Sequence, residues 1–546
     1  MTDIEISRSS KLKNIVKIAK QLKLKKKDLF LYGNKFAKIL NFKKGNQNAK
    51  LVLVTAINPT SSGIGKTTVS IGLADALKIL NKKVCLSLRE PSLGPVFGIK
   101  GGATGGGFSQ VVPMEDINLH FTGDFHAITS ANNLLSSLID NHIFQGNALG
   151  FKKVVFKRCL DLNDRALREV VVSKSNGAKP REEEFTITAA SEVMAILSLA
   201  KDLEDLKLRL GNILVGYNKK NLPIFARDLC AEDAMAILLK DAIKPNLAQT
   251  LGGAPAVIHC GPFANIAHGC SSLIATNFAV KNSEFAITEA GFGSDLGAEK
   301  FFDIVCREGN LSPSCVVLVA TLRALKLHGG ASLSELSKPN LKALKSGLGN
   351  LGSHINILKN FNVPIVVSLN LFSDDSENEV EVVKNFALVK GVSFETCKVW
   401  EKGGKGALDL AKRVVSLSEK PSKLNLIYNL EDSVKTKIEK LALKVYGAGG
   451  VEYSKEAEKS IKLIEKNNFS KLPVCVAKTQ YSLSDDKNLI GAPSGFKITV
   501  RDVEIRSGAG FLVVLLGEML LMPGLGKAPA ACKMKIDENE VIEGIF

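Results

Sequence analysis

The fold of this chain is decided by the segment Thr60-Ser61-Ser62-Gly63-Ile64-Gly65-Lys66-Thr67-Thr68. The apolar run over residues 51–54 precedes it and predicts a buried strand, while residues 70–77 predict a helix. A glycine-rich loop between a strand and a helix brings together backbone N–H groups, the positive end of the helix, a lysine and a hydroxyl group. These groups bind polyphosphates, so the segment predicts a nucleotide-binding loop.

The predicted nucleotide-binding residues are Thr60, Ser61, Ser62, Gly63, Ile64, Gly65, Lys66 and Thr67. The match to the phosphate-loop pattern is imperfect, because the pattern begins with a glycine where this chain has Thr60, while the Gly-x-Gly-Lys-Thr core is intact. The alternative is a structural turn that happens to precede a helix. The flanking strand and helix favour nucleotide binding, since the mechanism of the motif requires both.

Length and composition exclude several classes of protein. The 546 residues are 45% hydrophobic and 23% charged, which is ordinary for a globular chain with room for about three domains. The net charge of +17 comes from lysines spread along the chain without interleaved aromatic residues, so we expect anionic substrates and no nucleic acid as partners. There is no apolar signal core, no bilayer-spanning run and no Cys-x-x-Cys pair. We therefore expect a cytoplasmic protein with no membrane partner.

Strands that alternate with helical segments predict the α/β class. Six further apolar runs are expected to be strands, over residues 83–88, 153–156, 213–215, 284–287, 315–319 and 364–369. We expect a mostly parallel sheet that contains the phosphate loop, carries helices on both faces and binds ligands at the carboxyl ends of its strands. We predict three domains. Residues 1–360 form the phosphate-loop domain with N-terminal helices, one of which is amphipathic over residues 12–22. Residues 361–450 and residues 451–546 form two smaller α/β domains.

Arg89 and Glu90 follow the predicted strand over residues 83–88, where an α/β fold places reactive groups. An arginine there can stabilise charge on a phosphoryl group in transfer, and a carboxylate can hold Mg²⁺ or accept a proton. The alternative is that the two side chains pair only with each other.

Three other features contain groups that suit a ligand. His120-Phe121-Thr122-Gly123-Asp124-Phe125-His126 places a carboxylate between two imidazoles, which is typical of a metal site, an acid–base pair or a hydrogen-bonded loop. The glycines at 291, 293 and 297 nearly match a dinucleotide fingerprint, but the last comes one residue late, so we expect a ligand-facing loop. Phe372 and Trp400 are suited to stack on a flat heterocycle, although a lone tryptophan is as readily a core residue.

Four longer runs are specific enough to identify a family. They are LREPSLGP at residues 88–95, VPMEDINLHFTGDFHAI at 112–128, GPFANIAHGC at 261–270 and AKTQYSLSDD at 477–486. Through them the chain resembles the formate–tetrahydrofolate ligases over nearly its whole length. The resemblance implies that ATP phosphorylates formate to formyl phosphate, whose carbon is then attacked by N10 of tetrahydrofolate. The products are 10-formyltetrahydrofolate, ADP and phosphate.

The resemblance also implies roles for the residues singled out above. Lys66 and the loop amides would hold the β- and γ-phosphates of ATP, Thr67 would contact Mg²⁺, and Arg89 would bind formyl phosphate. Glu90 and Asp124 would position a metal or remove the proton from the attacking amine.

For the folate, the resemblance implies that Phe372 and Trp400 sandwich the pterin, so that the predicted domain over residues 361–450 would stack on folate. It further implies a monovalent cation, K⁺ or NH₄⁺, as cofactor and a homotetramer as the assembly.

Some positions depart from the family pattern and favour a second hypothesis. A glutamate is usual at Ile64 and at Gly252, an aspartate at Thr186, a histidine at Asn132, and an Arg-Phe-Pro run in place of Leu371-Phe372-Ser373. Several of these changes remove charge. The alternative to an active ligase is therefore a catalytically impaired homologue that still binds folate or nucleotide.

Overall fold

The computed structural model describes residues 1–60, 63–98, 102–174, 180–517 and 519–545. Its largest element is a 12-stranded sheet with the order β1-β2-β14-β15-β4-β16-β3-β17-β18-β19, in which β6 also pairs with β14 and β5 with β6. Five of these strands are β1 (Leu29–Tyr32), β2 (Phe36–Ile39), β5 (Gly105–Gly106), β6 (Ser109–Val112) and β14 (Asn246–Thr250). The strands from β15 to β19 in that order run parallel. Their bounds are Pro255–Ile258 (β15), Val84–Leu88 (β4), Phe285–Glu289 (β16), Lys50–Ala56 (β3), Cys315–Ala320 (β17), Ile365–Asn370 (β18) and Ser393–Cys397 (β19).

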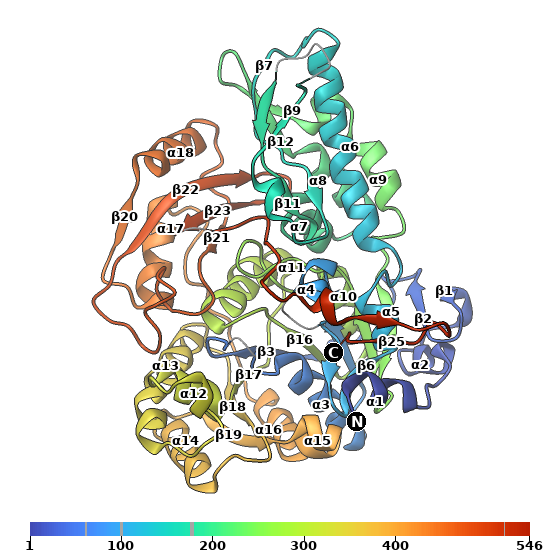
Figure 1. Cartoon of the computed structure of the whole chain (residues 1–546), viewed down its shortest axis with the longest axis vertical. Helices are drawn as coiled ribbons and strands as arrows, with labels where there is room; N and C mark the ends of the chain where they lie inside the picture. Colours follow the sequence, from blue (N-terminus) through green and yellow to red (C-terminus); the bar gives the residue numbers. More distant parts are fainter. Residues whose placement is uncertain (61–62, 99–101, 175–179, 518, 546) are drawn as a thin grey trace.

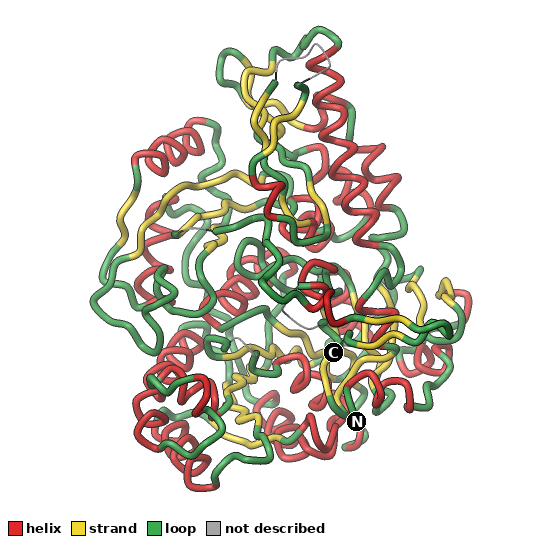
Figure 2. Tube along the Cα trace, in the orientation of Figure 1, coloured by secondary structure: helices red, strands yellow, loops and turns green. Residues whose placement is uncertain are grey.

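This parallel block is buried because its strands are apolar along their length. Every residue of β4, β16, β17 and β18 is buried, as expected for parallel strands that helices cover. The helices packed against the block include α3 (Lys66–Ile79), α10 (Leu273–Asn282), α13 (Leu341–Lys359) and α16 (Leu408–Ser418). In Figure 2 the yellow strands in the lower half of the molecule run between red helices. The prediction of an α/β fold with a mostly parallel sheet is confirmed.

Two of the predicted strands lie outside this block. Residues 83–88, 284–287, 315–319 and 364–369 match β4, β16, β17 and β18. Residues 153–156 and 213–215 instead overlap β7 (Phe151–Val154) and β12 (Leu214–Asn218), which pair antiparallel in a separate sheet with β13 (Pro223–Phe225). The expectation that they belong to the parallel sheet is wrong, because a short apolar run does not specify which sheet it joins.

The C-terminal part of the chain builds a sheet of its own (Figure 1). Its strands are β20 (Val451–Tyr453), β22 (Ile498–Arg506), β23 (Phe511–Leu516) and β21 (Val474–Ala477). By contrast, β18 and β19 from the predicted second domain continue the large sheet. The boundary expected at residue 361 therefore does not coincide with an edge of the sheet, and the division into three domains stays a prediction.

The N-terminus forms two short helices, α1 (Asp3–Ser9) and α2 (Ile15–Gln21). Helix α2 lies within the predicted amphipathic segment and buries Ile15, Ile18 and Ala19. Within the described ranges, none of the helices combines the length and the apolar character that crossing a bilayer requires.

Candidate active site

The predicted site residues converge on one edge of the large sheet. The predicted phosphate loop follows β3, Arg89 and Glu90 follow β4, Phe372 comes two residues after β18, and Trp400 lies in α15 (Val399–Lys402) after β19. Because these strands are parallel, their carboxyl ends meet at the edge where α/β folds bind ligands. The strand order β4-β16-β3-β17-β18-β19 places the loop between Arg89 on one side and the two aromatic residues on the other.

The phosphate loop enters α3 through left-handed backbone at Gly63 and Gly65, whose φ angles are 78° and 79°. Glycine adopts this region without strain. Lys66 is the first residue of α3, so its side chain starts where the helix amides point at the loop. The Thr60 hydroxyl donates to the Gly63 carbonyl at 3.2 Å. The predicted ligands Ser61 and Ser62 lie outside the described residues.

Asn370, the last residue of β18, holds the loop from the side. Its Nδ2 donates to the Ile64 carbonyl at 3.3 Å, and a Cβ at Gly65 would lie 2.7 Å from the same nitrogen. A glycine is therefore needed at Gly65. The Ile64 side chain is only 4% exposed and belongs to the main apolar core. At this departure from the family pattern the side chain packs under the loop.

Glu289, the last residue of β16, joins two of the predicted catalytic groups and was missed by the sequence analysis. The Thr67 hydroxyl donates to Glu289 Oε2 at 2.8 Å, and Arg89 Nη2 lies 4.0 Å from Glu289 Oε1. The Glu289 side chain is 2% exposed. This carboxylate is placed between the loop and Arg89 because β16 is the strand between β3 and β4.

The Arg89 guanidinium contacts groups other than the neighbouring Glu90. Its Nη1 donates to the Pro262 carbonyl at 3.2 Å, and its Nε is buried without a partner among the described residues. The alternative that Arg89 and Glu90 pair only with each other is wrong. A Cβ at Gly291 would lie 3.1 Å from Arg89 Nη1, so the loop expected to face a ligand lies directly against this arginine.

Glu90 and Asp124 lie in a buried polar cluster around Lys38, a residue of β2 (Phe36–Ile39) that the sequence analysis also missed. Lys38 Nζ lies 2.8 Å from Asp124 Oδ1, and both side chains are 3% exposed. Asn246 Nδ2 donates to Asp124 Oδ2 at 2.9 Å. Glu90 Oε2, by contrast, has no partner among the described residues. Burial, with the neighbouring Asp124 carboxylate, holds the pKa of Glu90 well above its usual value.

The two imidazoles of the 120–126 segment do not gather around Asp124. His120 and His126 line a cavity of about 350 Å³ with Asp161, and no described group of three or more His, Cys, Asp or Glu side chains is arranged to hold a metal ion. Asp161 accepts from the Ser92 hydroxyl at 2.6 Å and from the Leu93 N–H at 3.0 Å. Burial raises its pKa to about 7. Asp161 thus fixes the turn that follows Glu90.

Phe372 and Trp400 are both exposed at the site edge, at 38% and 52%. The Arg323 guanidinium lies 4.1 Å from the centre of the Phe372 ring and covers one of its faces. Trp400 rests on Gly107, where a Cβ would lie 2.7 Å from Trp400 Cγ. Neither aromatic ring is a core residue, so each leaves surface for stacking.

Three of the remaining departures from the family pattern lie in packed surroundings. A Cβ at Gly252 would lie 2.4 Å from the Asp75 carboxylate, in the turn before β15 at the opposite edge of the sheet. Asn132 Nδ2 donates to the Lys157 carbonyl at 3.0 Å, and the Thr186 hydroxyl donates to the Leu521 carbonyl at 3.4 Å. None of these three contacts involves the loop or Arg89.

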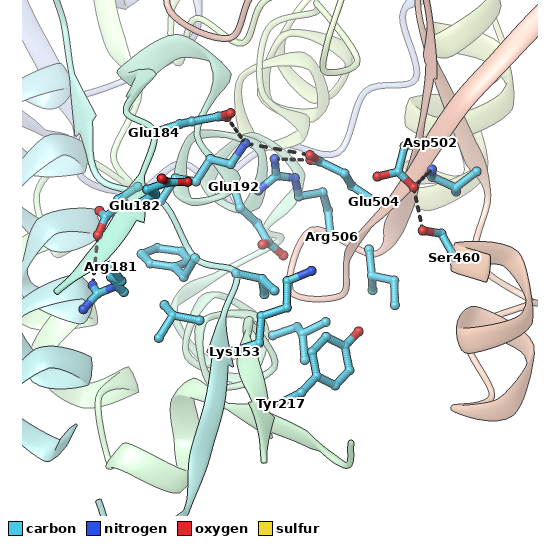
Figure 3. Close-up of a pocket in the computed structure, with 18 of the residues that line it drawn as sticks. Lys153, Arg181, Glu182, Glu184, Glu192, Tyr217, Ser460, Asp502, Glu504 and Arg506 are labelled. Carbon is cyan, nitrogen blue, oxygen red and sulfur yellow. Dashed lines mark hydrogen bonds and ion pairs between the residues drawn. The ribbon is translucent and has the colours of Figure 1, made fainter. Parts of the chain in front are cut away.

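Figure 3 shows a second cavity, of about 840 Å³, lined by β7 and β12 on one side and β22 on the other. Arg506 pairs with Glu504 at 2.7 Å, and the buried Glu192 accepts from the Gly508 N–H at 2.8 Å. None of the predicted site residues lines this cavity. Lys157 and Arg181 in its lining pair with Glu184 and Glu183, and the residues predicted from the sequence lie instead at the sheet edge.

Comparisons with known proteins identify the family. The family model described as formate–tetrahydrofolate ligase matches residues 1–546. A formate–tetrahydrofolate ligase of Campylobacter concisus (strain 13826) is 55% identical over 548 aligned residues, which cover 100% of both chains. This chain belongs to the formate–tetrahydrofolate ligase family.

Proposed function

We propose that this chain ligates formate to tetrahydrofolate at the carboxyl edge of the parallel sheet, with ATP as the energy source and formyl phosphate as the intermediate. The observation that carries the proposal is the continuous arrangement of Thr67, Glu289 and Arg89 at the carboxyl ends of the neighbouring strands β3, β16 and β4. This arrangement connects the nucleotide-binding loop with the positive charge of Arg89, which is suited to bind an acyl phosphate. No observation favours the alternative of a catalytically impaired homologue.

In the first step a formate oxygen attacks the γ-phosphorus of ATP, and ADP leaves. Lys66 and the amides at the start of α3 hold the β- and γ-phosphates. Arg89, whose Nε is buried without a described partner, stabilises the charge on the transferred phosphoryl group. The loop and Arg89 lie on opposite sides of Glu289, which supports a reaction in which the phosphoryl group passes between them.

In the second step N10 of tetrahydrofolate attacks the formyl carbon, the carbon–oxygen bond to phosphate breaks, and the amine loses a proton. Phe372 and Trp400 orient the pterin by stacking. Glu90 is the better proton acceptor of the two predicted carboxylates, because one of its oxygens has no described partner. Asp124 is occupied by Lys38 and Asn246, and its role is to position Lys38 beside Glu90.

The groups at the loop fit Mg²⁺. The Thr67 hydroxyl and the buried Glu289 carboxylate are oxygen donors 2.8 Å apart, and oxygen donors are what this cation prefers. Mg²⁺ bound with ATP would neutralise charge on the phosphates during transfer. Thr67 would hold it directly, and Glu289 would fix the orientation of Thr67.

A monovalent cation, K⁺ or NH₄⁺, is part of the proposal on the strength of the resemblance. A cation beside the Glu90 carboxyl group would favour its ionised form and so lower the pKa of Glu90 from its raised value. The unpartnered Oε2 would then remain available to accept the proton.

We also propose a cytoplasmic homotetramer. All ten cysteines carry free thiols, as expected in a reducing compartment. Apolar side chains are exposed on α8 (Leu203–Gly211) and α9 (Glu232–Leu239), including Leu208 and Ile237 at 65% each. Helix faces of this kind are suited to contacts between subunits. Light scattering on the purified protein measures the assembly.

An assay that couples ADP release to a change in absorbance tests the proposed reaction. Purified protein with Mg²⁺ and K⁺ is given ATP, formate and tetrahydrofolate, and each substrate is then omitted in turn. We expect ADP release to require formate and the formation of 10-formyltetrahydrofolate to require all three substrates. ADP release at the same rate with and without formate and tetrahydrofolate would contradict the proposal.

A further inference from the structure

The run AKTQYSLSDD at residues 477–486 takes no part in the proposed chemistry, yet it reaches the base of the phosphate loop. It begins with Ala477, the last residue of β21. The next residue is Lys478, whose Nζ lies 2.7 Å from Asp295 Oδ2; both side chains are 0% exposed. Lys478 also donates to the carbonyls of Thr479, at 3.1 Å, and Ser482. The C-terminal sheet is thereby tied to the segment after β16 by a fully buried ion pair.

Asn58 contacts both Asp295 and the 477–486 run. It lies two residues after the end of β3 and two residues before Thr60. Its side-chain Nδ2 donates to Asp295 Oδ1 at 3.3 Å and to the Gln480 carbonyl at 3.2 Å. Its Oδ1 accepts from Asn350 Nδ2 at 2.9 Å. Asn58 is itself 0% exposed. A buried amide with both ends engaged is fixed in orientation.

The backbone of Asn58 is held by two histidines. Its N–H donates to His354 Nε2 at 3.0 Å, and its carbonyl accepts from His328 Nε2 at 2.9 Å. His354 Nδ1 lies 2.7 Å from Ser294 Oγ, and His328 Nδ1 accepts from the Gly491 N–H at 3.3 Å. The His328 ring donates at one nitrogen and accepts at the other, so it is neutral, while His354 Nε2 also lies 2.9 Å from Asn58 Oδ1. Burial lowers the pKa of His354 to about 4 and also lowers that of His328.

Every hydrogen-bonding group of Asn58 is thus used, and the partners come from four separate parts of the chain. Gly491 closes the network, because its carbonyl accepts from Asn350 Nδ2 at 2.6 Å. Pro59 follows Asn58 and has a fixed φ angle, so the orientation of Asn58 sets the direction in which the loop leaves β3.

We propose that Asn58 is a positioning residue through which residues 478–491 set the conformation of the phosphate loop and hence its affinity for ATP. The inference rests on the proposed function of that loop. It assigns the 477–486 run a role at the nucleotide site, at the opposite end of the loop from the Asn370–Ile64 hydrogen bond.

The direct test is Asn58→Asp, which keeps the size of the side chain but replaces both Nδ2 donors by a carboxylate facing Asp295. We expect the dissociation constant for ATP, measured by calorimetry without other substrates, to rise about tenfold or more, while KM for tetrahydrofolate stays within about twofold. A variant that binds ATP like the wild type would overturn the proposal.

If Asn58→Asp does not fold, the double variant Lys478→Met with Asp295→Asn takes its place. It removes the buried charges together and keeps an oxygen at residue 295 for Asn58. The matched control is Lys437→Met, since Lys437 is likewise 0% exposed and donates to the carbonyls of Ser470 and Leu472 in the C-terminal unit.

We expect the control to lower the melting temperature and leave ATP binding unchanged, and the double variant to weaken ATP binding. Equal effects of control and double variant on ATP binding would overturn the inference. A wild type that binds no ATP would instead overturn the proposed function, so the two failures are distinguishable.

Discussion

The Thr67 hydroxyl donates a hydrogen bond to the Glu289 carboxylate at 2.8 Å, between the first turn of α3 and the last residue of the neighbouring strand β16. Glu289 also lies 4.0 Å from Arg89. One buried carboxylate therefore orients both Thr67, the proposed Mg²⁺ ligand, and Arg89, the residue proposed to bind formyl phosphate.

Replacing that carboxylate by an amide tests its role. Glu289→Gln keeps the shape and removes the charge, so we expect the Mg²⁺ concentration needed for half-maximal activity to rise and kcat to fall by about 10- to 100-fold, as for loss of a hydrogen bond to a charged group. Calorimetry of ADP with and without Mg²⁺ measures the same effect without turnover. Glu284→Gln, at the exposed start of the same strand, is the control and should behave as wild type. Equal Mg²⁺ dependence in both variants would show that Glu289 has no role in Mg²⁺ binding.

Lys66→Ala is expected to reduce formyl phosphate formation by about 100-fold or more, because a donor to the transferring phosphoryl group is lost. The melting temperature should change little, since Lys66 is only partly buried at the start of α3. Lys78→Ala, at the other end of the same helix, serves as the control. Residual activity near the wild-type level in a folded Lys66→Ala protein would refute the assigned role.

Trp400→Ala should raise KM for tetrahydrofolate by about tenfold, in line with the free energy of stacking on an aromatic ring, with a smaller effect on kcat. Steady-state kinetics at saturating ATP and formate measure both constants. Phe144, which is 57% exposed at the end of α6 (Asp124–Phe144), provides the comparison through Phe144→Ala. An unchanged KM would return Trp400 to a structural role.

Asp161 makes the stability of the site depend on pH. Its pKa is raised by burial from 3.8 to about 7, so between these values the folded state binds more protons than the unfolded state. The free energy of unfolding then falls as pH rises, by at most about 1.4 kcal/mol per pH unit for this group. Denaturant unfolding of wild type and Asp161→Asn between about pH 4 and pH 7 checks the sign. The variant should show the shallower fall; parallel curves would contradict it.

The local features of the fold could be predicted from sequence, whereas the long-range partners could not. Strand, loop and helix around Lys66 follow from hydrophobic pattern and glycine placement within a few residues. Glu289 was missed because its partner Thr67 is 222 residues away, and Lys38 because Asp124 is 86 residues away. Only the strand order brings these pairs together.

The same limit explains the misplaced elements. The apolar runs at β7 and β12 read like those of β4 or β17, but their pairing partners decide the sheet. The sequence left open what Ile64 does in place of the usual glutamate, and the structure places its side chain in the core. Pattern alone does not tell which way a loop residue faces.

The most direct test of the account is the fate of the formate oxygens. Formate labelled with ¹⁸O is given to the enzyme with ATP and tetrahydrofolate, and the released phosphate is analysed by mass spectrometry. If formyl phosphate forms between Lys66 and Arg89, each phosphate released with 10-formyltetrahydrofolate carries one oxygen from formate. Product formation with unlabelled phosphate would contradict the proposed intermediate.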